Sequence, residues 1–363
     1  MDKKEGLSKF QLFLILIHAQ IGLGIITLPH DVFMTSNKSA WITILISGFI
    51  IQVFILIFGY IIKKFPSYSL PELIEKLLGR IPGKTLNVLY TIYFVLLASS
   101  LLAKYVVILK IWMMPVTPKW ILVILVLITA VYAAKENLSI IARFFLIASS
   151  VLIIFLGLST IALKESKFIY ALPILKEGFQ PVLKGIPKTI NSFQGYETLL
   201  FIFPFVKGSP RDIVKTASMA NLFVTFMYTF LVFVSIVFFS SPELTLVSEP
   251  VLYLVKSLSF RIIERPDLIF TSMWIVLIIT SIIVLISLAT ISFTQVINQK
   301  KKTGVLYSLA LLCFLLSMTV YGEYKTTNVI GLIQPLIFFF AFIIPFGLVL
   351  YSNIYHKIKG ERQ

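Results

Sequence analysis

Two apolar segments of the sequence are interrupted by glycine where a regular membrane helix would be expected. The first interruption is Gly22-Leu23-Gly24, and the second, in the other half of the chain, is Gln194-Gly195-Tyr196-Glu197. Such a break leaves backbone N–H and C=O groups unpaired, so inside a membrane it must be buried in protein or line a cavity. A half-helix N-terminus also offers N–H donors to an anion such as a carboxylate. Close helix packing is the alternative role for these glycines, but a matched pair of breaks favours a ligand site at the bilayer midplane.

Two ionisable side chains within apolar segments could act at such a site. Glu197 is the only carboxylate deep within a segment, and it could bind a substrate ammonium group, carry a proton or hold the unwound backbone of its own segment. Lys104 shares one helix face with Tyr93, Leu97 and Ser100, because their spacing is i, i+4, i+7 and i+11. We expect this face to line the same cavity, although Lys104 could instead extend to water at the membrane surface.

Hydroxyl and amide groups near the breaks are weaker candidates. Thr280 and Ser281 lie on a polar line of a later apolar segment, but hydroxyls in membrane helices usually bond to their own backbone. His18 and Gln20 precede the first break and either face the cavity or bond to a neighbouring helix.

Nothing in the sequence indicates an enzyme. It contains no nucleophile–base arrangement, no paired catalytic carboxylates and no phosphate-binding loop, since no strand precedes Gly22-Leu23-Gly24. Three histidines without Cys or carboxylate clusters predict no metal site and no cofactor. The net charge of +16 comes from residues scattered between apolar segments, which favours positive-inside topology over nucleic-acid binding.

Composition places the chain among integral membrane proteins. Of its 363 residues, 58% are hydrophobic and 13% are charged, whereas a soluble protein has roughly 25% charged residues. No stretch outside the apolar segments is long enough for a soluble domain, so residues 1–363 are expected to form a single membrane domain. The lone cysteine, Cys313, lies in an apolar segment and cannot form an intrachain disulfide.

Ten segments have the apolar character of membrane spans. Short helices are also expected at 69–79, at the membrane surface, and at 249–258. The expected spans are 10–34, 40–62, 85–111, 119–134, 138–163, 187–206, 213–240, 267–297, 304–321 and 327–353.

Positive charge sets the expected orientation. Short loops such as Lys300-Lys301-Lys302 belong to the inner side, so both termini are expected in the cytoplasm. Ten spans divide into five plus five, and the two halves then begin on opposite sides of the membrane, as in an inverted repeat. The repeats are approximately 10–163 and 187–353, and the loop 164–186 lies outside the cytoplasm. The breaks fall in spans one and six.

The residues resemble those of a known family. Ser8-Lys9-Phe10-Gln11, followed by the run from Gly22 to Pro29, is similar to the opening of the spore germination permeases. These are the B subunits of nutrient germinant receptors in endospore-forming bacteria, a branch of the amino acid–polyamine–organocation superfamily. Supporting residues follow in order: Pro173-Ile174-Leu175 with Gly178 and Pro181, Gly195-Tyr196-Glu197 through Phe203-Pro204, and Ile263-Glu264-Arg265 leading to Trp274.

The resemblance implies an all-α fold like that of the leucine transporter, with a ligand held between the unwound first and sixth spans. It also implies a complex in the spore inner membrane with an A subunit and a C-subunit lipoprotein. The ligand would be a germinant, most often an L-amino acid, with sugars or nucleosides used by some relatives. The positions that match the family's binding region are Gly22, Gly24, Tyr93, Leu97, Gln194, Gly195, Tyr196, Glu197, Thr280 and Ser281.

Three functions are compatible with such a site. The favoured one is a sensor, in which a bound nutrient biases the helix packing and signals to partner subunits. The alternative is an autonomous, proton-coupled amino-acid transporter, and a third is a scaffold with a vestigial site. The absence of a second buried carboxylate beside Glu197 favours the sensor.

Overall fold

The computed structural model describes residues 6–22, 24–258, 264–298, 302–320 and 322–360. These residues are helical almost throughout, and the only strand-like feature among them is an isolated bridge between Leu7 and Val206. The principal helices are α1 (Lys9–Gln20), α2 (Gly24–Ser36), α3 (Ala40–Lys64), α4 (Leu70–Leu78), α5 (Arg80–Trp112), α6 (Lys119–Ala134), α7 (Leu138–Ala162), α8 (Gln180–Ser192), α9 (Thr198–Ile202), α10 (Pro210–Phe238), α11 (Ser241–Leu246), α12 (Pro250–Ser257), α13 (Pro266–Ile297), α14 (Thr303–Thr319), α15 (Glu323–Phe338) and α16 (Ile344–Gly360).

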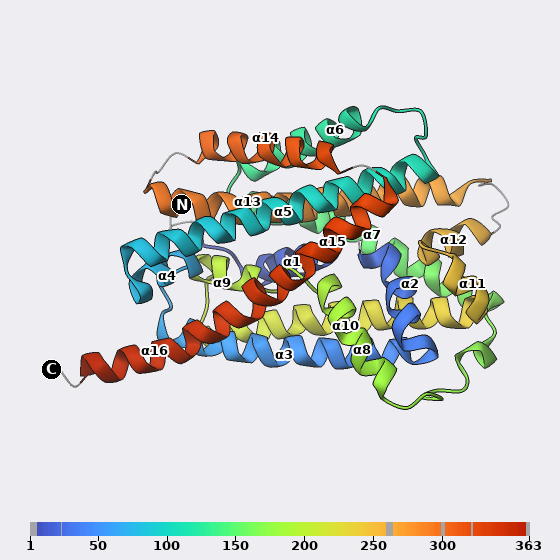
Figure 1. The fold of residues 1–363 in the computed structure, drawn as a ribbon, viewed down its shortest axis with the longest axis horizontal. Coiled ribbons are helices and arrows are strands. Elements are labelled where there is room, and N and C mark those ends of the chain that lie inside the picture. Colours follow the sequence, from blue (N-terminus) through green and yellow to red (C-terminus); the bar gives the residue numbers. More distant parts are fainter. Residues whose placement is uncertain (1–5, 23, 259–263, 299–301, 321, 361–363) are drawn as a thin grey trace.

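The long helices run along a common direction (Figure 1). Helix α5 packs along α13, and α3 packs along α10, on either side of the central α1. Helices α6 and α14 pack together at the edge of the molecule. This arrangement leaves α1, with the break that follows it, in the middle of the bundle.

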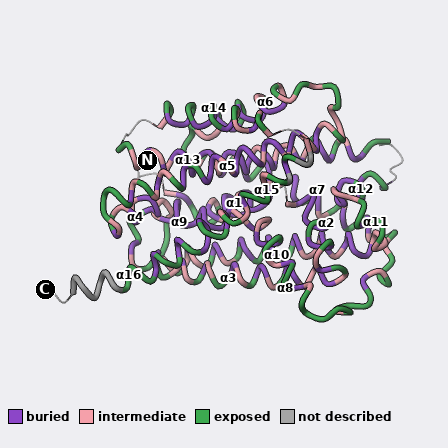
Figure 2. The backbone as a smooth tube through the Cα atoms, viewed as in Figure 1, coloured by how far each residue is buried: buried purple, intermediate pink, exposed green. Residues whose placement is uncertain are grey.

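Burial distinguishes the central helices from the outer ones. Buried positions are concentrated on α1, α5 and α13, whereas the outer helices carry exposed apolar side chains (Figure 2). Leu125 of α6 and Leu311 of α14 are about three-fifths exposed, and Ile147 of α7 is more exposed still. A soluble protein rarely exposes apolar surface on this scale, so these sides are expected to face lipid.

Six helical stretches of the described chain are long and apolar enough to cross a membrane. Helices α6 and α14 are apolar but shorter, and two further expected spans are each divided between two helices. The protein is therefore a multi-pass integral membrane protein. The six stretches are Gly24–Lys64, Arg80–Trp112, Leu138–Glu165, Pro210–Phe238, Pro266–Ile297 and Asn328–Asn353.

The first interrupted segment consists of α1 and α2. Helix α1 begins with a capping box, in which Ser8 Oγ accepts from the Gln11 N–H at 3.1 Å and Gln11 Oε1 accepts from the Ser8 N–H at 2.9 Å. It ends at Gln20, and α2 begins at Gly24. The predicted break at Gly22 and Gly24 is therefore present, although Leu23 lies outside the described residues.

The second interrupted segment consists of α8, a turn and α9. The turn contains Gly195, whose φ of +118° is a conformation that L side chains rarely adopt. Pro204 lies in a short 3-10 helix, Phe203–Phe205, that follows α9. The expected start of this span at residue 187 is late, because α8 already begins at Gln180.

The two expected short helices are confirmed. Helix α4 is flanked by a Ser69–Glu72 capping box and by Gly79 at φ +91°, and α12 occupies most of 249–258. A feature that was not expected is the π-helical turn Phe339–Ile343 between α15 and α16.

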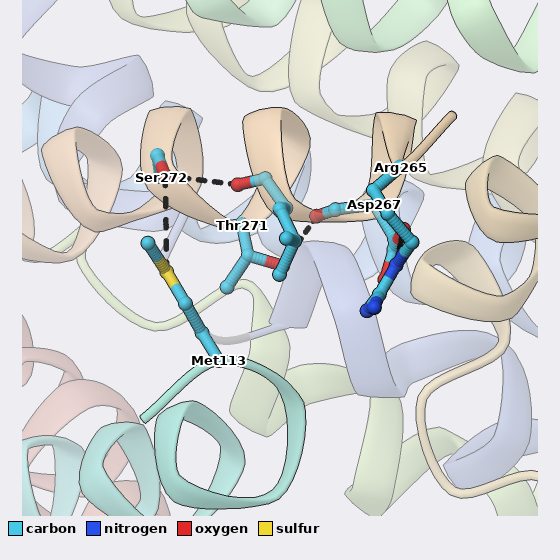
Figure 3. A network of polar contacts seen from close by, with 6 residues as sticks. Met113, Arg265, Asp267, Thr271 and Ser272 are labelled. Atoms are coloured by element: carbon cyan, nitrogen blue, oxygen red, sulfur yellow. Dashed lines mark hydrogen bonds and ion pairs between the residues drawn. The ribbon is translucent and has the colours of Figure 1, made fainter. Parts of the chain in front are cut away.

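The start of α13 is fixed by an ion pair (Figure 3). Arg265 Nε and Nη2 donate to the two carboxylate oxygens of Asp267 at 3.1 and 2.8 Å. Thr271 Oγ1 donates to the Asp267 carbonyl one turn later, at 2.7 Å. A bidentate pair of this kind restricts the orientation of both side chains, and it anchors the helix that supplies Trp274 and Ser281. Ile263, which precedes this pair in the family-like run, lies outside the described residues.

Candidate ligand site between the broken helices

A cavity of about 380 Å³ lies where the two interrupted segments meet. Its volume falls in the range of pockets that bind small molecules. We call it the central cavity, and it extends from the two breaks along α2, α5, α8 and α15. Residues that define it are Gly22, Gly24, Leu97, Gln194, Ser281 and Ile337.

The two breaks are in direct backbone contact. A Cβ atom at Gly195 would overlap the carbonyl group of Ala19, so only glycine allows the second break to approach the end of α1 this closely. Tyr228 of α10 joins the same two segments, since its hydroxyl lies 2.8 Å from the Gln20 carbonyl oxygen and 3.1 Å from that of Ser192. We call the part of the cavity beside the two breaks its floor. The shape of this floor therefore depends on both breaks together.

Helix α13 packs against the first break. Ser281 Oγ lies 3.2 Å from the His18 carbonyl oxygen and 3.3 Å from that of Ile21. Trp274 Nε1 donates to the Gly22 carbonyl oxygen at 3.4 Å. A Cβ atom at Gly22 would lie 2.7 Å from Ser281 Oγ, so glycine is needed for this approach. These contacts satisfy carbonyl groups that the end of α1 leaves without helical partners.

Glu197 is buried behind the cavity and does not line it. Its Oε2 accepts the Gly195 N–H at 2.8 Å, and its Oε1 accepts the Tyr93 hydroxyl at 3.3 Å. The side chain is 1% exposed. Of the three roles considered for this carboxylate, holding the unwound backbone of its own segment has these contacts in its support.

Two tyrosines connect the site to the π-helical turn. Tyr196 donates to the Ala341 carbonyl oxygen at 2.7 Å, and Tyr90 donates to that of Phe340 at 2.9 Å. Both tyrosines are buried. A π-helical turn frees carbonyl groups from regular α-helical bonding, and the two hydroxyls satisfy those groups here.

His18 bonds to neighbouring helices and does not line the cavity. Its Nδ1 lies 3.1 Å from Thr280 Oγ1 of α13, and its Nε2 lies 3.0 Å from Ser149 Oγ of α7. Gln20 behaves differently, since it lines the cavity and its Oε1 has no hydrogen-bond partner in the described chain.

The structure divides the predicted site residues into two groups. Gly195, Tyr196, Glu197, Tyr93 and Thr280 form the wall behind the cavity through the contacts given above. The residues that line the cavity itself are Gly22, Gly24, Leu97, Lys104, Gln194 and Ser281.

Several polar cavity residues were not among the predicted ones. Asp31 of α2 lines the cavity, and it lies near the end of the expected span 10–34, whereas only a carboxylate deep within a span was considered. The spacing of Asp31 from Gly24, seven residues along a helix, could have revealed it, because positions i and i+7 share a face. Lys188 and Asn191 lie within the expected span 187–206, but they were not named as site residues, and the structure places both on α8 where they line the cavity.

Helix α15 supplies the remaining wall. Ile330, Ile333, Gln334 and Ile337 line the cavity from one side of this helix. Their i, i+3, i+4 and i+7 spacing indicates a shared helix face. The sequence signal was present, but it resembles that of any packed membrane helix.

The sequence was compared with those of known proteins. A family model described as "Spore germination protein" matches residues 6–330. The chain is 28% identical to spore germination protein GerQB of Bacillus cereus over 269 residues, which cover 74% of each chain. It is 26% identical to spore germination protein B2 of Bacillus subtilis strain 168 over 372 residues, covering 100% of both.

Two solved structures have a similar fold. MhsT in complex with L-phenylalanine gives a TM-score of 0.63 at 15% identity, covering 86% of this chain and 79% of that one. A Na⁺-coupled sialic acid symporter in a substrate-bound, outward-open state also gives 0.63, at 12% identity, covering 95% of this chain and 78% of that one. These similarities confirm an all-helical membrane fold of the leucine-transporter type.

Proposed function

This chain belongs to the spore germination protein family, and from that premise we propose that it is the nutrient-sensing subunit of a spore germinant receptor. It binds a small nutrient, with an L-amino acid favoured, in the central cavity. The bound nutrient favours one packing of the helices over another, and partner subunits respond to that change. Such a shift requires that the ligand bind the two packings with different affinity.

The observation that carries this proposal is the polar floor of the central cavity. Helix α2 begins at Gly24 on the cavity, and the first N–H groups of a helix have no partners within it. They can donate to a carboxylate. The unpartnered Gln20 Oε1 can accept from an ammonium group, and the amide of Gln194 can accept through its oxygen or donate through its NH2 group to other polar atoms of the ligand. The L-phenylalanine complex of MhsT, which has a similar fold, supports an amino acid as the ligand class.

We propose a topology of ten spans in one membrane domain, residues 1–363. Helices α1 and α2 form the first span, and α8 and α9 form the sixth. The spans are related as two inverted repeats, approximately 10–163 and 187–353, with both termini on the cytoplasmic side. In a spore this is the core side of the inner membrane, and the loop 164–186 then lies outside. The meeting of the two interruptions within the bundle supports this pairing of spans.

The signal would leave the site through the last span. Tyr90 and Tyr196 connect the wall behind the cavity to the π-helical turn Phe339–Ile343. Membership of the spore germination protein family supports a role within a receptor complex, and the proposed partners are an A subunit and a C-subunit lipoprotein. The proposed role is binding and signalling, without a catalytic step.

An autonomous transporter is the second candidate function. The observation in its favour is the fold shared with a Na⁺-coupled sialic acid symporter. Purified protein in liposomes distinguishes the two. The sensor is expected to bind labelled amino acid without accumulating it, whereas uptake driven by a proton gradient would establish the transporter.

The site assignment is tested with spores in which this chain is the B subunit of the only nutrient receptor. Gly24→Leu is expected to abolish the germination response, because a Cβ at this position already lies 3.0 Å from Ser192 Cβ and 3.2 Å from Tyr228 Oη. Gly157→Leu is the matched control, since a Cβ at that exposed position of α7 meets nothing within 4 Å. Both variants must be present in the membrane at normal level, and an unchanged response of Gly24→Leu would refute the site.

A further inference from the structure

Three charged side chains line the central cavity. Asp31 comes from α2, Lys104 from α5 and Lys188 from α8. We call them the charged cluster. Both lysines are near enough to Asp31 for their positive charges to act on its carboxylate. With two cations and one carboxylate, the cluster carries a net charge of +1.

Asp31 and Lys188 lie one to two helical turns away from the breaks. Helix α2 runs from Gly24 at the break to Asp31, and α8 runs from Lys188 to the second break. On α5, Leu97 and Lys104 lie two turns apart, and α2 and α8 are inclined to the long helices (Figure 1). The seven residues from Gly24 to Asp31 correspond to a rise of about 10 Å.

Apolar side chains also line the cavity, among them Leu97, Ile333 and Ile337. A ligand that binds at the breaks through its amino-acid groups would pack its side chain against such residues on the way to the lysines.

The two lysines are available to a ligand. Neither Lys104 nor Lys188 has a hydrogen bond or an ion pair with any residue that the structure describes. Lys104 is partly buried, which removes some of the water that would otherwise screen its charge. A lysine that served only as a membrane-surface anchor would have no reason to line the cavity opposite a second lysine and a carboxylate.

We propose that the charged cluster is an anion subsite that recognises a second carboxylate on the ligand. This inference rests on the proposed function and narrows its ligand class to dicarboxylic amino acids in preference to their amides. Lys104 and Lys188 donate to the side-chain carboxylate of the ligand. Asp31 limits the net charge and orients the ligand by repulsion, so a carboxylate approaches from the lysine side.

The test compares isosteric ligand pairs. Equilibrium binding of L-glutamate against L-glutamine, and of L-aspartate against L-asparagine, is measured on the purified full-length chain. Hydrogen bonds to charged groups are strong enough to give the dicarboxylate a roughly tenfold lower Kd than its amide. Lys104→Met and Lys188→Met should each reduce that ratio, and Asp31→Asn should increase it. Lys184→Met, one turn before Lys188 on α8 and not on the cavity, is the matched control and should leave the ratio unchanged.

Several outcomes would overturn the subsite. One is equal affinity for acid and amide in the wild-type chain. Another is an equal weakening of both by the lysine variants, which would indicate electrostatic steering at the entrance alone. Binding of only neutral amino acids such as leucine, abolished by Gly24→Leu, would overturn the subsite and leave the proposed function intact. Failure of every L-amino acid to bind would overturn both.

Discussion

Glu197 Oε2 accepts a hydrogen bond from the backbone N–H of Gly195 at 2.8 Å, and both residues belong to the turn between α8 and α9. The same turn rests on Ala19 at the end of α1, where only glycine fits. One carboxylate therefore holds the backbone that brings the two interrupted segments together. Its importance for ligand binding is expected to be indirect.

Replacement of Glu197 should act mainly on stability. Glu197→Ala leaves the Gly195 N–H and the Tyr93 hydroxyl unpaired in a buried place, which is expected to cost about 1–3 kcal/mol for each group. Glu197→Gln keeps an acceptor and should be milder. Thermal unfolding in detergent and ligand affinity, measured on both variants, check this. A stable Glu197→Gln protein that has lost all ligand binding would contradict the structural role and favour ammonium binding or proton transfer.

Gly195→Ala should destabilise the protein more than an ordinary glycine replacement. The φ of +118° is costly for alanine, about 1–3 kcal/mol, and the added Cβ would overlap the Ala19 backbone. Gly157→Ala is the control, because that position is open and helical, and it should be neutral or slightly stabilising. The ratio of folded to aggregated protein after membrane extraction and the midpoint of thermal unfolding provide the comparison. Equal behaviour of the two variants would show that the close approach of the breaks is unimportant.

Tyr196→Phe should separate binding from signalling. It removes the hydrogen bond to the Ala341 carbonyl at a cost of about 1 kcal/mol, but no atom that lines the cavity. We expect nutrient affinity within about threefold of the wild type and a slower germination response at saturating nutrient. Tyr170→Phe, in the loop that follows α7, is the control and should leave both unchanged. If Tyr196→Phe spores germinate normally at every nutrient concentration, the route through the π-helical turn is wrong.

The bidentate ion pair of Arg265 and Asp267 should be sensitive to geometry as well as charge. Arg265→Lys retains the positive charge but cannot make both hydrogen bonds. Asp267 is almost completely buried, so the loss of one bond is expected to loosen the start of α13 and lower the unfolding midpoint. Hydrogen exchange of the first turns of α13 measures this directly. Exchange identical to that of the wild-type chain would show that the pair does not hold the helix.

Much of the architecture could be predicted from sequence because membrane spans are long and apolar. An interruption in a span also stands out, since unpaired backbone groups are costly in lipid. Gly22, Gly24 and Gly195 identified both interruptions, and Ser69 with Gly79 identified a short helix between spans. Hydropathy did not locate the beginning of α8 at Gln180, since its polar first turns resemble a loop. The π-helical turn in the last span leaves no mark in an apolar sequence.

The residues of the candidate site at the two breaks could be predicted from the sequence, but those on the surrounding helices were harder to predict. Two matched breaks favoured a cavity over close helix packing, and Gly24 and Gln194 were predicted as site residues from that pattern. Whether a polar residue such as Tyr93 or Thr280 faces a cavity or bonds to a neighbour depends on helix rotation, and one sequence does not determine that rotation. Asp31 lay within an expected span but close to its end, where a carboxylate usually meets water.

The central claim is that a nutrient occupies the cavity between the broken helices, and site-specific protection from chemical labelling tests it most directly. Leu97→Cys is placed in a Cys313→Ala background, and its rate of maleimide labelling is measured with and without an equimolar mixture of L-amino acids. Lys176→Cys, exposed in the loop before α8, reports any general effect of the mixture. The account predicts that the mixture slows labelling at residue 97 but not at residue 176. Unchanged labelling of Leu97→Cys, under conditions in which the same mixture triggers germination, would contradict it.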